Sequence, residues 1–151
     1  MRAGTENVVG IAAFGAAAAA AQRHFAAEAA HMLALRNRLE SGLKAISPHA
    51  VIFGEAAGRL PNTTLFAVEG MKAETAVIAF DLEGIAVSSG AACSSGKVQP
   101  SHVLAAMEIS PALVRGAVRV SLGLEHRRGR CRTLSCRSEK AALYRGHSIA
   151  A

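Results

Sequence analysis

The sequence predicts an α+β fold, in which one long helix is followed by a small sheet covered by helices on one face. Three observations lead to this class. A proline-free stretch whose first half is rich in alanine, the best helix former, runs from residue 8 to residue 47. Short β-rich and helical runs then alternate as far as residue 123. The 151 residues also match the length of one ordinary domain, which is enough to bury a core.

The first element is predicted to be one long helix, or two in near succession, that begins at Val8 and is ended by Pro48. Six consecutive alanines at residues 16–21 indicate close packing of small side chains. In the second half, apolar side chains recur at spacings of three and four, which places them on one helical face: Met32, Leu35, Leu39, Leu43 and Ile46.

The later elements are short and are bounded by turn residues. Strands are predicted at residues 51–53, 63–68, 85–88 and 117–123. A helix is predicted over residues 71–84, with Gly84 at the position where a left-handed C-terminal cap would be needed. Pro100 and Pro111 each open a further short helix, and the first of these is expected to run through Met107.

The positive charge of the chain is concentrated near its end. Residues 1–123 carry a net charge of +1, whereas residues 124–151 carry +5 and include five arginines between residues 127 and 137. This final segment has no helical or strand periodicity and predicts a disordered or non-native tail. With only six aromatic residues available for base stacking, the composition does not favour a nucleic-acid partner.

Cysteine content and the N-terminal segment indicate the compartment. Three cysteines, an odd number without repeating spacing, do not indicate a disulfide framework, which favours a reducing environment. The apolar stretch at residues 8–21 follows Glu6 and Asn7 and consists mostly of alanine, unlike a signal peptide, and it is too short to span a bilayer. We therefore expect a cytoplasmic protein that has no membrane partner.

Cys93 lies among small residues in "VSSGAACSSG", residues 87–96. A structural cysteine prefers apolar neighbours that bury it, whereas a loop of Gly, Ala and Ser leaves the thiol accessible to a reaction partner. Local sequence leaves two readings open, a nucleophile and an idle surface cysteine, because Lys97 is the only neighbour that could lower the pKa of the thiol. The spacing of the six histidines identifies no partner base: His24, His31, His49, His102, His126 and His147.

Longer stretches resemble the cysteine desulfurases, pyridoxal-phosphate enzymes of the class V aminotransferase fold that take sulfur from L-cysteine. "AVSSGAACSSGKVQPSHVLAAM", followed by "VRVSLG", is similar to their active-site cysteine region, in the form found in the branch that serves iron-sulfur cluster assembly and nitrogenase maturation. "RAGTENVVGIAAFGAA" resembles the segment that enters the long connecting helix, and "LPNTTLFAVEG" resembles a strand of the small domain. The resemblance covers residues 2–123 and implies the small C-terminal domain of a fold-type I enzyme.

This resemblance implies roles for three residues. Cys93 matches the nucleophile that accepts sulfur from the substrate L-cysteine as a persulfide, releases alanine and passes the sulfur to a carrier or iron-sulfur scaffold protein. Arg119 matches the residue that binds the substrate carboxylate, a task suited to its two-pronged donor set. Thr5 matches a residue that reaches the cofactor phosphate of the neighbouring subunit in a homodimer.

The resemblance also implies a division of the chain and a missing part. Residues 1–22 match the end of the large domain and the start of the connecting helix, residues 23–123 match the small domain, and residues 124–151 match nothing and resemble translation in a shifted frame. None of the lysines lies in the context of the cofactor-bearing lysine: Lys44, Lys72, Lys97 and Lys140. Glu108 stands where the family commonly has glycine. This difference brings into question the predicted end of the helix that runs through Met107.

We therefore expect a C-terminal part of a cysteine desulfurase that is inactive by itself, because no lysine is available to hold pyridoxal phosphate. The alternative is a non-enzymatic module that relays sulfur or complements a separate large domain. A small thiol reductase would need a resolving cysteine, for which Cys131 and Cys136 in the tail are the only candidates. Two cysteines without a second pair are poor evidence for a metal site, and none is predicted.

Overall fold

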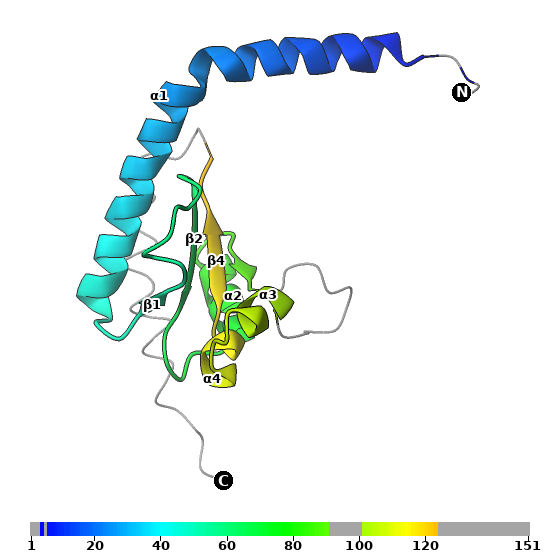
Figure 1. The fold of residues 1–151 in the computed structure, drawn as a ribbon. Helices are drawn as coiled ribbons and strands as arrows, with labels where there is room; N and C mark the ends of the chain where they lie inside the picture. Colours follow the sequence, from blue (N-terminus) through cyan, green and yellow to red (C-terminus); the bar gives the residue numbers. More distant parts are fainter. Residues whose placement is uncertain (1–3, 5, 91–100, 124–151) are drawn as a thin grey trace.

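The computed structural model describes residue 4 and residues 6–90 and 101–123. The elements follow in chain order: α1 (Val8–Ile46), β1 (Val51–Ile52), β2 (Thr63–Ala67), α2 (Ala73–Leu82), β3 (Ser88–Ser89), α3 (His102–Ala106), α4 (Pro111–Arg115) and β4 (Val118–Ser121) (Figure 1). The predicted α+β class and element order are confirmed. The strand expected at residues 85–88 is shorter and lies at Ser88–Ser89. The segment that contains Cys93, residues 91–100, is called the cysteine loop below; it and the predicted tail at residues 124–151 lie outside the described residues.

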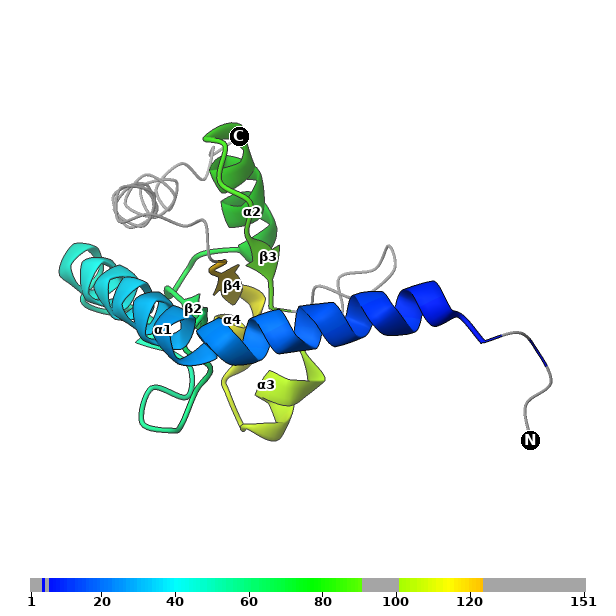
Figure 2. The same ribbon diagram turned by 90° about the horizontal axis from the view of Figure 1, so that it is seen from above.

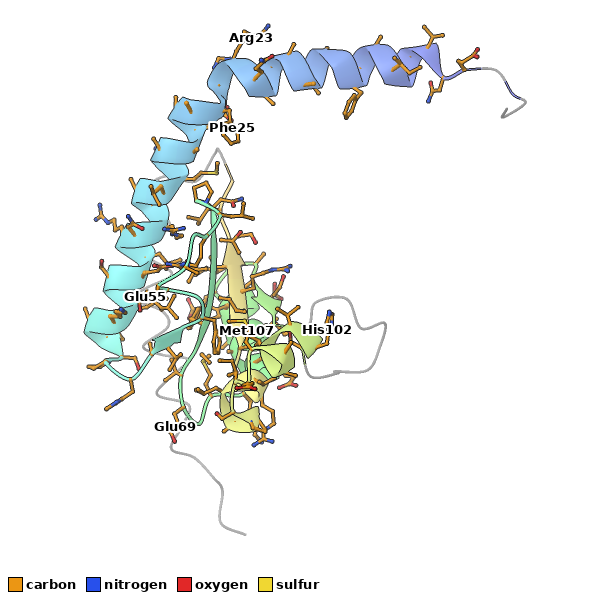
Figure 3. All side chains as sticks on the ribbon, in the orientation of Figure 1. Arg23, Phe25, Glu55, Glu69, His102 and Met107 are labelled. Carbon is orange, nitrogen blue, oxygen red and sulfur yellow. The ribbon has the colours of Figure 1, made fainter. Side chains whose placement is uncertain are left out.

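Helix α1 is one continuous helix, and its two halves have different surroundings. It begins at Asn7, whose side-chain Oδ1 accepts a hydrogen bond from the Gly10 amide at 2.9 Å. The helix changes direction near Arg23 and Phe25, so that the first half runs away from the sheet (Figure 3). Five large apolar side chains of α1 are between 65% and 80% exposed, although contact of apolar surface with water is unfavourable: Val8, Val9, Ile11, Phe14 and Phe25.

The strands form one antiparallel sheet in the order β1-β2-β4-β3. On one face, Phe66, Val118 and Val120 pack in a core with apolar residues of α1 and α2. On the other face, Ala67 and Ala117 pack with apolar residues of α3 and α4. Figure 2 shows α2 and α3 on opposite sides of β4.

The expectation that helices cover one face of the sheet was therefore incomplete. α3 and α4 are only five residues each, but they enclose the end of the sheet where Ala67 and Ala117 leave room for them. Small residues at these strand positions allow the helices to approach closely. Farther along β4 on the same face, Arg119 is exposed.

The ends of α2 and α3 show the same backbone motif with different residues. Gly84 has a φ of 72°, and the amide of Ile85 donates to the Phe80 carbonyl at 2.9 Å. At the end of α3, Glu108 has a φ of 57°, and the amide of Ile109 donates to the Leu104 carbonyl at 3.1 Å. Both ends have the left-handed geometry in which glycine is favoured. The predicted Gly84 cap is thus confirmed. Helix α3 ends in the same way, although its left-handed residue is Glu108 and not a glycine.

A cluster of hydrogen-bonded charged residues connects the second half of α1 to β2 and to the segment before it. The Glu40 carboxylate accepts two hydrogen bonds from Arg59, at 2.7 and 3.0 Å, and one from the Thr64 hydroxyl at 2.7 Å. Arg36 donates to the Leu60 carbonyl at 2.7 Å, and its Nε lies 3.8 Å from Glu40. Burial raises the pKa of Glu40, but the hydrogen bonds from Arg59 and Thr64 and the positive charges of Arg59 and Arg36 outweigh this effect and hold the pKa below its ordinary value.

Candidate functional site

Arg119 lies on the exposed part of the sheet face that α3 and α4 share. Side chains alternate between the two faces of a strand, and Val118 and Val120 on either side of Arg119 point into the core of the other face. In the sheet register Arg119 is opposite Leu65 of β2 and opposite Ser88 of β3. Leu65, Arg119 and Ser88 therefore form one row across the sheet, with the guanidinium group on an open surface.

The entry to the cysteine loop is held close to this row. The Gly90 amide donates to the Ala117 carbonyl at 2.8 Å, which extends the pairing of β3 with β4 by one residue. A Cβ at position 90 would lie 2.9 Å from the Ala117 Cβ, a distance too short for two carbon atoms. The glycine is needed here because a side chain would push the start of the loop away from β4.

The exit from the loop is fixed on the same face of the sheet. Ser101 is the N-cap of α3, and its Oγ accepts a hydrogen bond from the Leu104 amide at 3.4 Å. Leu104 packs in one cluster with Ala117, the residue that also bonds Gly90. Both described ends of the segment that contains Cys93 are thus attached around Ala117, two residues before Arg119.

Of the three predicted site residues, only Arg119 lies within the described structure. Cys93 and Thr5 lie outside the described residues, as do Cys131 and Cys136. His102 projects from the start of α3 on the outer side of that helix (Figure 3), and the other described histidines belong to α1 or the turn after it. In the described ranges no group of three or more His, Cys, Asp or Glu side chains is placed to hold a metal ion.

Sequence reasoning did not identify Ser88 as a neighbour of Arg119. Val87 packs in the core with α2, so the next residue must point to the opposite face of its strand. This alternation was visible in "IAVSSG" and in "VRVSLG". The register between the two strands was not visible, because it depends on which residues pair across the sheet.

The described residues do not form a site for pyridoxal phosphate. Such a site needs a lysine to bind the cofactor covalently. The described lysines are Lys44, which forms an ion pair with Glu55, and Lys72, which precedes α2. Both belong to elements that pack on the face of the sheet opposite Arg119. No described lysine can therefore serve a cofactor placed beside Arg119.

The sequence and the fold of the chain match a known class of proteins. Residues 1–129 match the aminotransferase class-V family, and the chain belongs to this family. Its relatives include Cysteine desulfurase NifS of Azotobacter vinelandii, 44% identical over 121 residues, which are 80% of this chain and 30% of that protein. A cysteine desulfurase of Gluconacetobacter diazotrophicus is 44% identical over 125 residues, which are 83% of this chain and 31% of that protein. The resemblance to cysteine desulfurases is thus confirmed.

Solved structures are similar over nearly the whole chain. A NifS-like protein from Rickettsia africae superposes with a TM-score of 0.80 at 32% identity, over 93% of this chain and 36% of the other. A second NifS-like protein superposes with a TM-score of 0.78 at 28% identity, over 95% of this chain and 35% of the other. The chain spans about a third of the length of the proteins it matches. No helix in the described part of the chain is long and apolar enough to cross a membrane.

Proposed function

We propose that this chain supplies the sulfur-accepting part of a cysteine desulfurase. Cys93 accepts the sulfur of L-cysteine as a persulfide while the Cβ–S bond of the substrate breaks and L-alanine is released, and Arg119 binds the carboxylate of the same substrate. One observation carries the proposal: the β3–β4 register puts Ser88 opposite Arg119, and Gly90, where the cysteine loop begins, is bonded to Ala117. The relatives named cysteine desulfurase support the choice of substrate.

The chemistry of both groups suits this task. Arg119 is exposed and forms no ion pair with another described residue, so that its guanidinium can donate two parallel hydrogen bonds to a carboxylate. Cys93 follows Gly90 by three residues, and three extended residues span about 10 Å. A tether of this length permits a thiol to reach a substrate held over β4 and then turn toward an acceptor protein.

Other parts of the proposal follow the family. Thr5 contacts a cofactor phosphate across a homodimer, and residues 1–22 and 23–123 serve as the entry to the connecting helix and as the small domain. The outer sulfur of the persulfide is transferred to a sulfur carrier or an iron-sulfur scaffold protein in the cytoplasm. No described residue is assigned to the pyridoxal phosphate that the family uses.

Taken alone, the chain does not turn over L-cysteine. The face of the sheet that carries Arg119 has no described lysine to hold the cofactor. The experiment is to incubate the purified chain with L-cysteine and added pyridoxal phosphate, and to measure L-alanine and sulfide. Release of both products above the rate with heat-denatured chain contradicts the proposed inactivity.

The second candidate function is a sulfur-relay or docking module that complements a separate large domain. The exposed apolar side chains of the first half of α1 favour it, because a second protein surface would remove them from water. Mass spectrometry of the chain mixed with an intact desulfurase and L-cysteine tests whether Cys93 gains one sulfur atom. The Cys93→Ser variant is the control, because Cys131 and Cys136 remain in it. Persulfide formed on Cys93 without the added desulfurase would exclude the relay.

A further inference from the structure

Ser88 stands beside Arg119 on the open part of the sheet. The two residues are direct cross-strand partners, and side chains of such partners lie on the same face with their Cβ atoms about 4.5–5.5 Å apart. Ser88 is half-buried, and its hydroxyl has no hydrogen-bond partner among the described residues. A hydroxyl group is thus available next to the guanidinium group.

We propose that Ser88 is a second carboxylate-binding residue, whose hydroxyl donates a hydrogen bond to the carboxylate that Arg119 holds. This inference rests on the proposed function, because it assumes that an amino-acid carboxylate binds at Arg119. A carboxylate has two oxygens with about four acceptor positions. The two-pronged guanidinium uses two of them, so acceptor positions remain for a hydroxyl group at the side.

The arrangement gives Ser88 a role in selecting the substrate. A hydroxyl beside a guanidinium adds binding energy only when the ligand brings an acceptor for both groups. L-cysteine has the carboxylate, whereas cysteamine has the same thiol and amine and lacks it. Ser88 therefore increases affinity for the amino acid and leaves affinity for the amine unchanged.

Ser89 is a matched control for Ser88. It is the next residue in the same strand, it is also half-buried, and it pairs with Val118, whose side chain lies in the core of the other face. Ser88→Ala and Ser89→Ala remove the same hydroxyl from opposite faces of β3. A difference between the two variants reports on the face that carries Arg119.

The test is a titration of the full chain with L-cysteine and with cysteamine under reducing conditions, followed by the amide resonances of β4 in NMR spectra. We expect Ser88→Ala to weaken L-cysteine binding about 5- to 10-fold, the effect of one hydrogen bond. Ser88→Thr keeps the hydroxyl and restores the affinity. Ser89→Ala leaves it unchanged, and no serine variant alters cysteamine binding. Thermal unfolding by circular dichroism confirms that each variant is folded.

The outcomes separate this inference from the proposed function. If Arg119→Gln weakens L-cysteine binding and Ser88→Ala does not, the role of Ser88 is wrong and the proposed function stands. Equal losses for L-cysteine and cysteamine in Ser88→Ala also contradict the inference. If Arg119→Gln has no effect, or if the unaltered chain binds L-cysteine no better than cysteamine, both proposals fail.

Discussion

Replacing Glu40 by glutamine tests how much the ion pair between α1 and Arg59 contributes to the stability of the fold. Glutamine has nearly the same shape and keeps a carbonyl oxygen for the Thr64 hydroxyl. It loses the negative charge that faces Arg59 and places an NH₂ group against the Arg59 donors. The substitution therefore removes the negative charge from the 2.7 Å bond between Arg59 Nη1 and Oε1, replaces the 3.0 Å bond from Nη2 to Oε2 by two facing donors, and leaves the rest of the packing in place.

The size of the effect follows from the burial of the pair. Two hydrogen bonds to a charged group are worth about 1.5–3 kcal/mol each, and breaking a buried ion pair costs about 3–5 kcal/mol. The side chains of Arg59 and Glu40 are 16% and 10% exposed, so that Arg59 regains some water when its partner is lost. We expect Glu40→Gln to lower the free energy of unfolding by about 3 kcal/mol, near the lower limit of that range.

Urea unfolding followed by far-ultraviolet circular dichroism measures this change. Glu55→Gln is the matched control, because it breaks the ion pair with Lys44 in which both side chains are about half exposed. Such a surface pair contributes less than about 1 kcal/mol. If Glu40→Gln cost no more than Glu55→Gln, the reasoning about the buried cluster would be refuted.

The lowered pKa of Glu40 adds a pH dependence to the same experiment. Because the carboxyl group has a lower pKa in the folded chain than in the unfolded chain, its contribution is fully present above the unfolded value of about 4.3. The contribution is lost as the pH falls through the folded value. The stability difference between the unaltered chain and Glu40→Gln should therefore shrink below about pH 4. A difference that stays constant through this acidic range contradicts the assignment.

Three further changes test the backbone around the site. Gly90→Ala should lower stability by about 1–3 kcal/mol and speed hydrogen exchange at residue 90, because its Cβ meets the Ala117 Cβ at 2.9 Å. Gly116→Ala should cost about 1–3 kcal/mol in urea unfolding, since its Cβ would lie 2.6 Å from the Met71 carbonyl oxygen. Glu108→Gly should stabilise the chain by about 0.5–1 kcal/mol in the same assay, because it relieves a glutamate with a φ of 57°.

Gly15→Ala is the control for these glycine changes. Its Cβ would have no atom within 4 Å, and the residue lies inside α1. Alanine is favoured over glycine in a helix by about 0.5–1 kcal/mol, so this variant should be more stable. Gly90→Ala or Gly116→Ala behaving like Gly15→Ala would show that the close contacts relax freely. A loss of stability in Glu108→Gly would show that the glutamate side chain stabilises the fold by more than its left-handed backbone conformation costs.

Local features of the fold were predictable because they depend on neighbours in the sequence. The proline-free run ending before Pro48 predicted α1, and Gly84 predicted the left-handed end of α2. The partners of Glu40 were not predictable. Thr64 lies 24 residues away in the sequence and Arg59 lies 19 residues away, and no local pattern selects either one.

The candidate site was also predictable only in part. The motifs around Cys93 and Arg119 are visible in the sequence and led to the family that the comparisons confirm. The roles of Cys93, Arg119 and Thr5 stay predictions. The position of Ser88 relative to Arg119 came from the pairing of β3 with β4, because a shift of one residue would have turned Ser88 to the other face.

The sequence by itself determined the long helix, the order of short elements, the separation of a nearly neutral body from a basic tail, and the family. These properties depend on local propensity, spacing and motif, which a single chain carries in its residue order. Only the tertiary structure decided that helices cover both faces of the sheet, that Glu40 is bound by Arg59 and Thr64, and that Ala117 bonds Gly90 and shares a core cluster with Leu104. The physical reason is that these contacts join residues far apart in the chain, and packing and strand register select them together.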